Sequence, residues 1–292
     1  MERELWRAVY LLAVELDNGW GHWRYSTAEV LGVYFWAVVH DRPTCWATRP
    51  EHWPNDLCPL WLMPQSTLSR RLRRPETVEL MTTVEQHLVA LLALGQYLLQ
   101  IIDAKALSVS KVSKDPDAGY GRGAGTFQVG YKFYAVWSTG PMPLAWGLAP
   151  MNVSEKTMAG RLIPTLPGGG YLLGDPAYDA NPLYDLAAEA GFQLVVKKRK
   201  GRGDRGLGHR RQSPARLRSI ELMKTDFGRE LYNQRNQIEC RFGTLTATGG
   251  GLAPLPAWVR HFNRVRNWVQ AKIIAAGVRW LILHEPMKLA LA

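Results

Sequence analysis

Apolar residues follow one spacing through the first hundred residues and a different one beyond them. In the first part, Ser26 and Glu29 form a capping box ahead of apolar positions that continue to Val38, which predicts a helix beginning at Ser26. A further helix is predicted over 76–93. We therefore expect residues 1–95 to form a mainly helical N-terminal domain.

From residue 96 on, short apolar runs alternate with turn residues. These runs predict strands at 98–103, 126–137, 143–149, 170–175 and 192–197, and helices at 154–165, 180–190 and 258–283. Three early strands followed by alternating helices and strands are typical of an α/β domain with a mixed sheet flanked by helices. This domain is expected to span 96–292, with its last helix packed against the sheet.

The glycine-rich stretch 119–125 needs separate treatment. It precedes a strand instead of opening a helix, so it does not have the context of a dinucleotide-binding loop. A flexible hairpin is the expected structure, and its glycines could also let the backbone pass close to a ligand such as DNA.

The distribution of charge narrows the class of partner. The 292 residues carry 36 Lys and Arg against 25 Asp and Glu, a net charge of +11. Residues 1–100 hold 9 basic and 11 acidic side chains, so the excess lies in the other 192 residues, with 27 basic against 14 acidic ones. Such an excess predicts a polyanionic partner, either nucleic acid or an anionic membrane. No basic amphipathic helix with an aromatic face dominates, so the sequence favours nucleic acid.

The sequence shows no pattern of export or membrane insertion. Glu2 and Glu4 stand where a signal peptide has basic residues, and the longest apolar run, 88–99, is too short to span a bilayer. The 3 cysteines have no Cys-x-x-Cys spacing, which argues for a reducing compartment. We expect a cytoplasmic, nucleoid-associated protein with no membrane partner.

Two segments concentrate basic side chains. Residues 197–218 hold ten basic residues, one acid and no periodicity, which predicts a basic loop, mobile when free, that either clamps DNA or is only solvated. Residues 66–75 are similar to the recognition helix of a helix-turn-helix unit, with Ser66 as N-cap, although their arginines could instead face water on a packing domain. The candidate DNA contacts are Arg70, Arg71, Arg73, Arg74, Lys132, Lys197, Lys198, Arg199, Lys200, Arg202, Arg210 and Arg211.

Two aspartates end apolar runs in the second part of the chain. Asp103 follows the run 97–102, and Asp175 precedes Pro176, which favours extended backbone at the carboxyl end of a strand, where α/β sheets place ligand sites. Two nearby acids are weaker alternatives: Asp179 is expected to cap the next helix and Asp185 to face solvent.

A third acid is predicted on a helix. Tyr232, Arg235 and Glu239 fall within about 60° of one another on one helix face. Arg235 stands four residues before Glu239, where it can hold that carboxylate ionised and fixed in direction. A solvated helix face with one ion pair is the alternative. Together with Asp103 and Asp175, however, Glu239 suggests a divalent-metal site.

These residues carry a resemblance to a known family. The chain resembles the bacterial insertion-sequence transposases of the DDE type, whose catalytic core is RNase H-like. One subgroup has the signature Tyr-x2-Arg-x3-Glu-x6-Lys, which this sequence matches at Tyr232, Arg235 and Glu239, with Thr246 in place of the lysine. The runs at 101–105 and 174–179 are similar to the family's surroundings of the first two acids.

The resemblance implies an RNase H-like sheet and an enzyme of DNA transposition and recombination. Such an enzyme cleaves strands at the ends of a transposable element and transfers them to target DNA. Asp103, Asp175 and Glu239 would hold two Mg²⁺ ions, for which Mn²⁺ would substitute, because hard cations take oxygen ligands. Arg235 would orient Glu239, and Tyr232 would contact the DNA strand. The partners would be double-stranded DNA, both transposon ends and target, and a second copy of the chain in a homodimer.

Other functions stay open at this point. A transposase remnant that only binds DNA is motivated by the missing lysine, and a stand-alone RNase H-like nuclease would use the same chemistry. A helix-turn-helix regulator would leave the three acids unexplained.

Overall fold

The computed structural model describes residues 1–19, 24–59, 61–92, 97–110, 112–123, 125–199, 207, 211–247, 252 and 254–290. The chain divides into two compact units, one of residues 1–93 and 244–292 and one of residues 94–243. Within the described residues, no helix combines the length and the apolar character that a membrane span needs.

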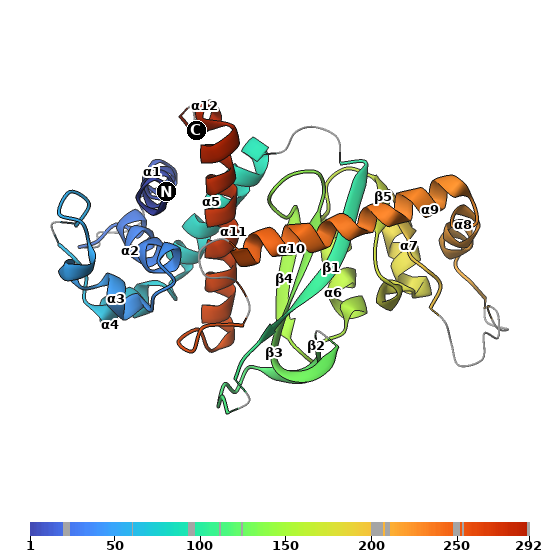
Figure 1. The fold of residues 1–292 in the computed structure, drawn as a ribbon, viewed down its shortest axis with the longest axis horizontal. Helices are drawn as coiled ribbons and strands as arrows, with labels where there is room; N and C mark the ends of the chain where they lie inside the picture. The colour runs from blue at the N-terminus through green and yellow to red at the C-terminus, as the bar shows by residue number, and fades with distance from the viewer. Residues whose placement is uncertain are drawn as a thin grey trace. The chain divides into compact units, whose positions relative to one another are not determined.

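The first unit is built from helices (Figure 1). Its elements are α1 (Glu2–Leu16), α2 (Thr27–Val39), α3 (Thr44–Ala47), the 3₁₀ turn η1 (Pro50–His52), α4 (Gln65–Arg71), α5 (Pro75–Leu92), α11 (Phe262–His284) and α12 (Pro286–Ala290). The predicted capping box is present at the start of α2, where Ser26 Oγ accepts the Glu29 N–H at 3.1 Å. Nearly every residue of α2 is buried, so this helix forms the core of the unit.

The C-terminal helix α11 belongs to this helical unit and not, as the sequence predicted, to the sheet. It packs along α5 and also contacts α1 and α2. Its buried Lys272 donates to the Val38 carbonyl oxygen at 3.2 Å and pairs with Asp41. This cation therefore lies in the core of the helical unit. The spacing of apolar residues predicted this helix correctly. Such spacing does not show which other element packs against the apolar face.

The candidate recognition helix differs from the expectation in two respects. α4 begins after Pro64 and not with a Ser66 cap. Arg71 is buried, with its guanidinium donating to the Tyr25 carbonyl oxygen at 3.0 Å and to Thr27 Oγ1 at 3.3 Å. Arg71 is therefore a structural residue and not a DNA contact. The neighbouring arginines that stay exposed are Arg70, Arg73 and Arg74.

The second unit is a mixed six-stranded sheet with flanking helices, an RNase H-like fold. Its strands are β1 (Leu99–Ser108), β2 (Gly119–Gly123), β3 (Thr126–Trp137), β4 (Ala145–Pro150), β5 (Gly170–Leu173) and β6 (Phe192–Val195). Its helices are α6 (Glu155–Leu162), α7 (Asn181–Glu189), α8 (Pro214–Leu222), α9 (Asp226–Asn233) and the first part of α10 (Gln237–Ala247), with the short 3₁₀ turns η2 (Ile163–Thr165), η3 (Pro176–Tyr178) and η4 (Gln234–Asn236).

The strand order gives the sheet two sections. β3 lies between β1 on one side and both β2 and β4 on the other, and all these neighbours are antiparallel to it. β5 and β6 continue beyond β1 as parallel strands. The sheet is therefore mixed, as predicted, and the parallel section contains the strand that leads to Asp175.

The elements differ from the predicted ones at informative points. β1 runs to Ser108, so Asp103 lies in the middle of a strand and not at its end. The glycine-rich stretch forms strand β2. The basic segment 197–218 is partly helical, because α8 begins at Pro214. η4 interrupts the single helix that was expected to carry Tyr232, Arg235 and Glu239.

The two faces of the sheet carry different cores. On one face Ile102, Tyr134 and Val136 pack with α6 and α7. On the other face the rings of Phe133 and Trp137 contact Phe242 of α10, at centroid distances of 5.8 and 4.9 Å. Figure 1 shows α10 running across the sheet.

Replacing Arg71 with methionine tests whether this arginine is structural. We expect Arg71→Met to lower the free energy of unfolding by about 1–3 kcal/mol, because two buried acceptors lose their donor. Urea denaturation measures this change, and Arg70→Met, at an exposed neighbour, serves as the control. A fully stable Arg71→Met protein with weakened DNA binding would restore Arg71 as a DNA contact.

Candidate active site

The register of two parallel strands brings Asp103 and Asp175 together. β1 and β5 pair Leu99 with Tyr171 and Ile101 with Leu173. Continued by two residues on each side, the same register sets Asp103 beside Asp175. Side chains alternate along extended chain, so both carboxylates share the parity of Ile101 and Leu173 and belong to one face of the sheet.

Each aspartate is held by a backbone N–H that follows it. Asp103 Oδ1 accepts the Ala104 N–H at 2.8 Å, and Asp175 Oδ1 accepts the Ala177 N–H at 2.9 Å. The backbone of Asp175 is extended, with φ −77° and ψ 170°, as expected for a residue before proline. One oxygen of each carboxylate thus fixes the side chain.

Glu239 reaches the same face on a helix. Trp137, Ala135 and Phe133 are the strand β3 partners of Ile101, Asp103 and Lys105, so the rings that hold Phe242 lie on the face of Asp103. Glu239 precedes Phe242 by three residues, which places it about one turn away along α10. Its side chain is exposed, and its charge acts on Asp103. The structure therefore brings the three predicted acids to one region.

Arg235 occupies a different position from the predicted one. Its Nη1 lies 3.9 Å from Asp103 Oδ2, so its ion pair is with the first acid and not with Glu239. The physical reason is η4, which breaks the regular four-residue spacing between Arg235 and Glu239. Arg235 Nε is buried without a hydrogen-bond partner in the described part of the chain.

Tyr232 is mostly buried and links the site to the start of the basic segment. Its ring lies 4.8 Å from Lys197 Nζ and 5.9 Å from Arg235 Cζ, measured to the ring centroid. Burial raises the pKa of Tyr232, and the Arg235 guanidinium opposes that rise. The ring serves as a platform between two cations, so little of it is left for the DNA contact that the resemblance implied.

The site concentrates negative charge, and its two aspartates are partly buried. Burial raises the pKa of Asp103 to about 6, and the nearby charges of Asp175 and Glu239 add to the effect while Arg235 opposes it. The pKa of Asp175 is raised as well, first by burial and then by Glu155, again against Arg235. Three like charges with one partial counter-charge favour the binding of a cation.

Two residues of this region were missed by the sequence analysis. Tyr178 is buried, its hydroxyl has no hydrogen-bond partner within the described residues, and its pKa is raised by burial and by Asp103, Asp175 and Glu155. Glu155 opens α6 and binds Lys132 Nζ at 2.6 Å. Lys132 is therefore a buried ion-pair partner and not the DNA contact that was predicted. No motif marks Glu155, because only the fold brings α6 to the end of β5.

Comparison with known proteins yields one match. Residues 94–276 match the model of the transposase DDE domain. The chain belongs to this transposase family. No curated protein and no solved structure matches the chain.

Membership in this family supports a transposase function. It places the chain among nuclease and transposase enzymes and implies DNA as the partner. Enzymes of the DDE family generally use divalent metals. The residues present fit such an ion, because hard cations prefer carboxylate oxygens and three carboxylates act in this region.

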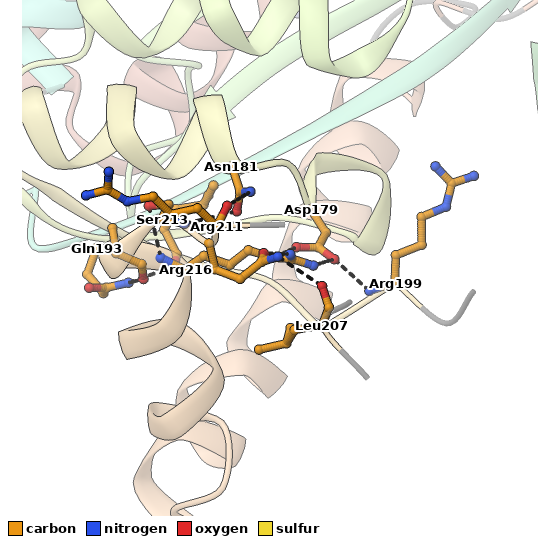
Figure 2. A network of polar contacts seen from close by, with 11 residues as sticks. Asp179, Asn181, Gln193, Arg199, Leu207, Arg211, Ser213 and Arg216 are labelled. Atoms are coloured by element: carbon orange, nitrogen blue, oxygen red, sulfur yellow. Dashed lines mark hydrogen bonds and ion pairs between the residues drawn. The ribbon is translucent and has the colours of Figure 1, made fainter. Parts of the chain in front are cut away.

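The basic segment of this DDE domain is fixed at both ends by Asp179 (Figure 2). The buried Asp179 carboxylate accepts two bonds from Arg216, at 2.7 and 2.8 Å, and the Arg199 backbone N–H at 2.9 Å. Asp179 was expected to cap α7, yet α7 begins after Ala180 without a side-chain cap. Both oxygens of the carboxylate accept these hydrogen bonds, so Asp179 is not an alternative metal ligand.

Further bonds close the same anchor. Ser213 Oγ donates to Asp185 Oδ1 at 2.6 Å, and Asn181 bonds to the backbone of Arg211 and Ser213. Asp185 is exposed, as predicted. Figure 2 shows the Arg199 guanidinium pointing away from the network. Three of the predicted DNA contacts, Lys200, Arg202 and Arg210, lie outside the described residues.

The raised pKa of Asp103 predicts how stability depends on pH without metal. The folded protein binds the Asp103 proton more tightly than the unfolded chain, so folding loses stability as pH rises from about 4 through about 6. We expect Asp103→Asn to be more stable than wild type at pH 8, by on the order of 2 kcal/mol, and equal to it at pH 4. Loss of the Arg235 pair would reduce this gain.

Thermal unfolding in EDTA at the two pH values measures the effect. Glu189→Gln, at an exposed carboxylate of α7, is the control and should show no such gain. A destabilised Asp103→Asn protein at pH 8 would mean that the charge is well compensated in the site.

Proposed function

We propose that the chain is an insertion-sequence transposase that cleaves and transfers DNA strands at the ends of its element. The observation that carries this proposal is the register of β1 and β5, which sets Asp103 beside Asp175 on the face that α10 covers. Three carboxylates brought to one region from a strand, from the turn after a strand and from a helix have no evident structural use. They are the ligand set that phosphodiester cleavage needs.

Asp103, Asp175 and Glu239 would hold two Mg²⁺ ions, with Mn²⁺ as a substitute. Such ions, when bound, supply charge neutralisation at the phosphate, activation of the attacking water or 3′-hydroxyl and stabilisation of the leaving oxygen. Asp103 would be the central ligand, because the charges of both other acids act on it. Its high pKa in the absence of metal means that a proton and a cation compete for the same oxygens.

The other residues would position these ligands. Arg235 holds the direction of Asp103 through the contact at 3.9 Å. Tyr232 holds Arg235 in place by lying against its guanidinium. We assign the chain to the Tyr-x2-Arg-x3-Glu subgroup on these residues, with roles shifted from Glu239 to Asp103. Thr246 stands where the subgroup has a lysine, so the lysine's contact to the element end would be missing.

DNA would be gripped along the basic segment. Arg199, Arg211 and Arg218 are exposed at its two anchored ends, and the rigid anchor at Asp179 keeps them near β6. Exposed Arg70, Arg73 and Arg74 of the helical unit are further candidates. The reaction joins both element ends to target DNA, so a homodimer on paired ends is the expected assembly.

Cleavage of oligonucleotides that carry the element's terminal repeats tests the proposal. Wild-type protein should nick these ends and join them to target DNA with Mg²⁺ or Mn²⁺ and not with EDTA. Asp103→Asn, Asp175→Asn and Glu239→Gln should each abolish both steps and leave DNA binding largely intact, because only metal ligation is lost. Glu189→Gln, at an exposed acid of α7 outside both the site and the anchor, is the matched control.

The alternatives give different results in the same assay. Metal-dependent cutting of any duplex or hybrid, without joining, would indicate a stand-alone nuclease. Tight binding of the ends without cleavage under any metal would indicate a remnant that only binds DNA.

The salt dependence of DNA binding tests the basic segment. Arg199, Arg211 and Arg218, all changed to alanine, should weaken binding to every sequence and lower the slope of log affinity against log salt. A loss of about 0.9 is expected for each phosphate contact removed. Arg161, Lys224 and Arg229 changed to alanine remove the same charge from elsewhere in the unit and serve as the control. Equal slopes for the two triple variants would reduce the segment to a solvated loop.

A further inference from the structure

The hairpin of β2 and β3 has one face on which only glycine fits. Every second residue of β2 is glycine: Gly119, Gly121 and Gly123. A Cβ at Gly123 would stand 2.7 Å from the Ala106 Cβ, and one at Gly121 would stand 2.8 Å from the Met151 carbonyl carbon. The glycines thus let the hairpin lie directly on the protein backbone, with the same alternation turning the intervening side chains outward.

The outward face carries two exposed aromatic rings and an arginine. Tyr120 is 66% exposed and Phe127 is 63% exposed. Their rings stack on each other with centroids 5.5 Å apart and an interplanar angle of 22°. The register pairs Arg122 with Phe127 and Tyr120 with Val129, so these four side chains share one face.

This platform is held rigidly. All five residues of β2 are paired with β3. On the other side of β3, β1 is paired as far as Gly130, and β4 continues the pairing beside β2 from Tyr131 on. The Val109 N–H continues the contact by donating to the Val129 carbonyl oxygen at 2.9 Å. The rings are therefore presented by a fixed sheet edge, and little conformational entropy is lost when they bind.

The chemistry of this face fits a nucleic-acid base better than an apolar protein surface. Residues 94–243 hold 21 Lys and Arg against 13 Asp and Glu, so the unit attracts polyanions. Binding of an apolar protein surface would bury the Arg122 charge without a counter-charge, which costs desolvation energy. A nucleotide instead offers a phosphate that pairs with this cation. A ring face can stack only on a base whose own face is open, which duplex DNA offers at ends, nicks and unpaired positions.

We propose that the exposed face of Tyr120, Arg122 and Phe127 binds unpaired DNA bases by stacking. This inference rests on the proposed function, in which strand cleavage and transfer create free strand ends. Tyr120 and Phe127 would each stack on a base, and Arg122 would contact the adjacent phosphate. Such a platform would hold a strand by its bases without selecting their sequence.

Fluorescence anisotropy with single-stranded and duplex oligonucleotides of the same sequence tests the platform. Tyr120→Ala combined with Phe127→Ala should weaken single-strand binding roughly ten-fold or more, on the scale expected for lost base stacking, and leave duplex binding within about two-fold. Tyr120→Phe combined with Phe127→Tyr keeps both rings and should bind like wild type. Phe227→Ala removes an aromatic residue that is 55% exposed elsewhere in the unit and should also have no effect.

A second probe separates bases from phosphates. A strand of abasic sites has the same phosphates without bases, so the double alanine variant should bind it as wild type does. Equal loss on all three ligands, or no loss on any, would overturn the inference. Light scattering compares the mass of the double alanine variant with that of wild type, both without DNA. A difference in mass would also overturn the inference, because the face would then form contacts between copies of the chain.

The result stays distinct from a failure of the proposed function. Wild-type protein that binds and cleaves duplex ends, with single-strand binding unaffected by the double change, would refute only the platform. Wild-type protein that binds no DNA would refute the transposase proposal itself. The melting temperatures of all variants are compared first, so that loss of folding is not counted as loss of binding.

Discussion

The candidate active site depends on the register between β1 and β5. The pairing begins where the Tyr171 N–H donates to the Leu98 carbonyl oxygen at 2.8 Å. Gly170 makes this approach possible, because it has φ +111° and any Cβ there would collide with the same carbonyl. Because side chains alternate along a strand, a slip of one residue would turn Asp175 to the face opposite Asp103. A backbone contact four residues before Asp175 thus decides whether the two acids lie on one face.

The site is a compromise between stability and readiness for a cation. Asp103 has a pKa near 6 because it is largely buried beside two other acids, with Arg235 as a distant counter-charge at 3.9 Å. A closer guanidinium would stabilise the metal-free fold and would compete with a metal for the same oxygen. The buried Tyr178 hydroxyl, unpaired in the described chain, belongs to the same balance, since it is a donor kept beside carboxylates without being committed to one. Unsatisfied groups of this kind gather at functional sites.

Local patterns predicted most of the fold and pointed to three acids that the structure brings to one region. Strand β3 was predicted with the observed bounds, and the Ser26 capping box and the extended Asp175 followed from local chemistry alone. What failed depended on partners distant in the sequence. Arg235 pairs with Asp103, 132 positions away, because a 3₁₀ turn alters the helical spacing that had pointed to Glu239.

Long-range partners also explain the errors in the basic residues. A sequence window cannot tell a solvated arginine from one that fills a hydrogen-bonding pocket. Arg71 is held by Tyr25 and Lys132 by Glu155, and both had been counted as DNA contacts. Arginines beside Arg71 with the same local pattern stay exposed. Charge in the sequence therefore indicated the class of partner correctly, although it could not assign each contact.

The two aspartates of the 174–179 run stand at the two ends of one 3₁₀ turn and have different surroundings. Pro176 keeps Asp175 extended, and the Ala177 N–H takes one of its oxygens, which leaves the other to the site. Four residues later, Asp179 emerges from the 3₁₀ turn and is saturated by Arg216 and by the Arg199 backbone. A saturated carboxylate has no oxygen left for a metal, so the run separates the candidate site residue Asp175 from an acid used for structure. Because a single rigid turn carries both, the start of the basic segment is fixed relative to Asp175. DNA held by that segment would then meet the carboxylates at a constant distance.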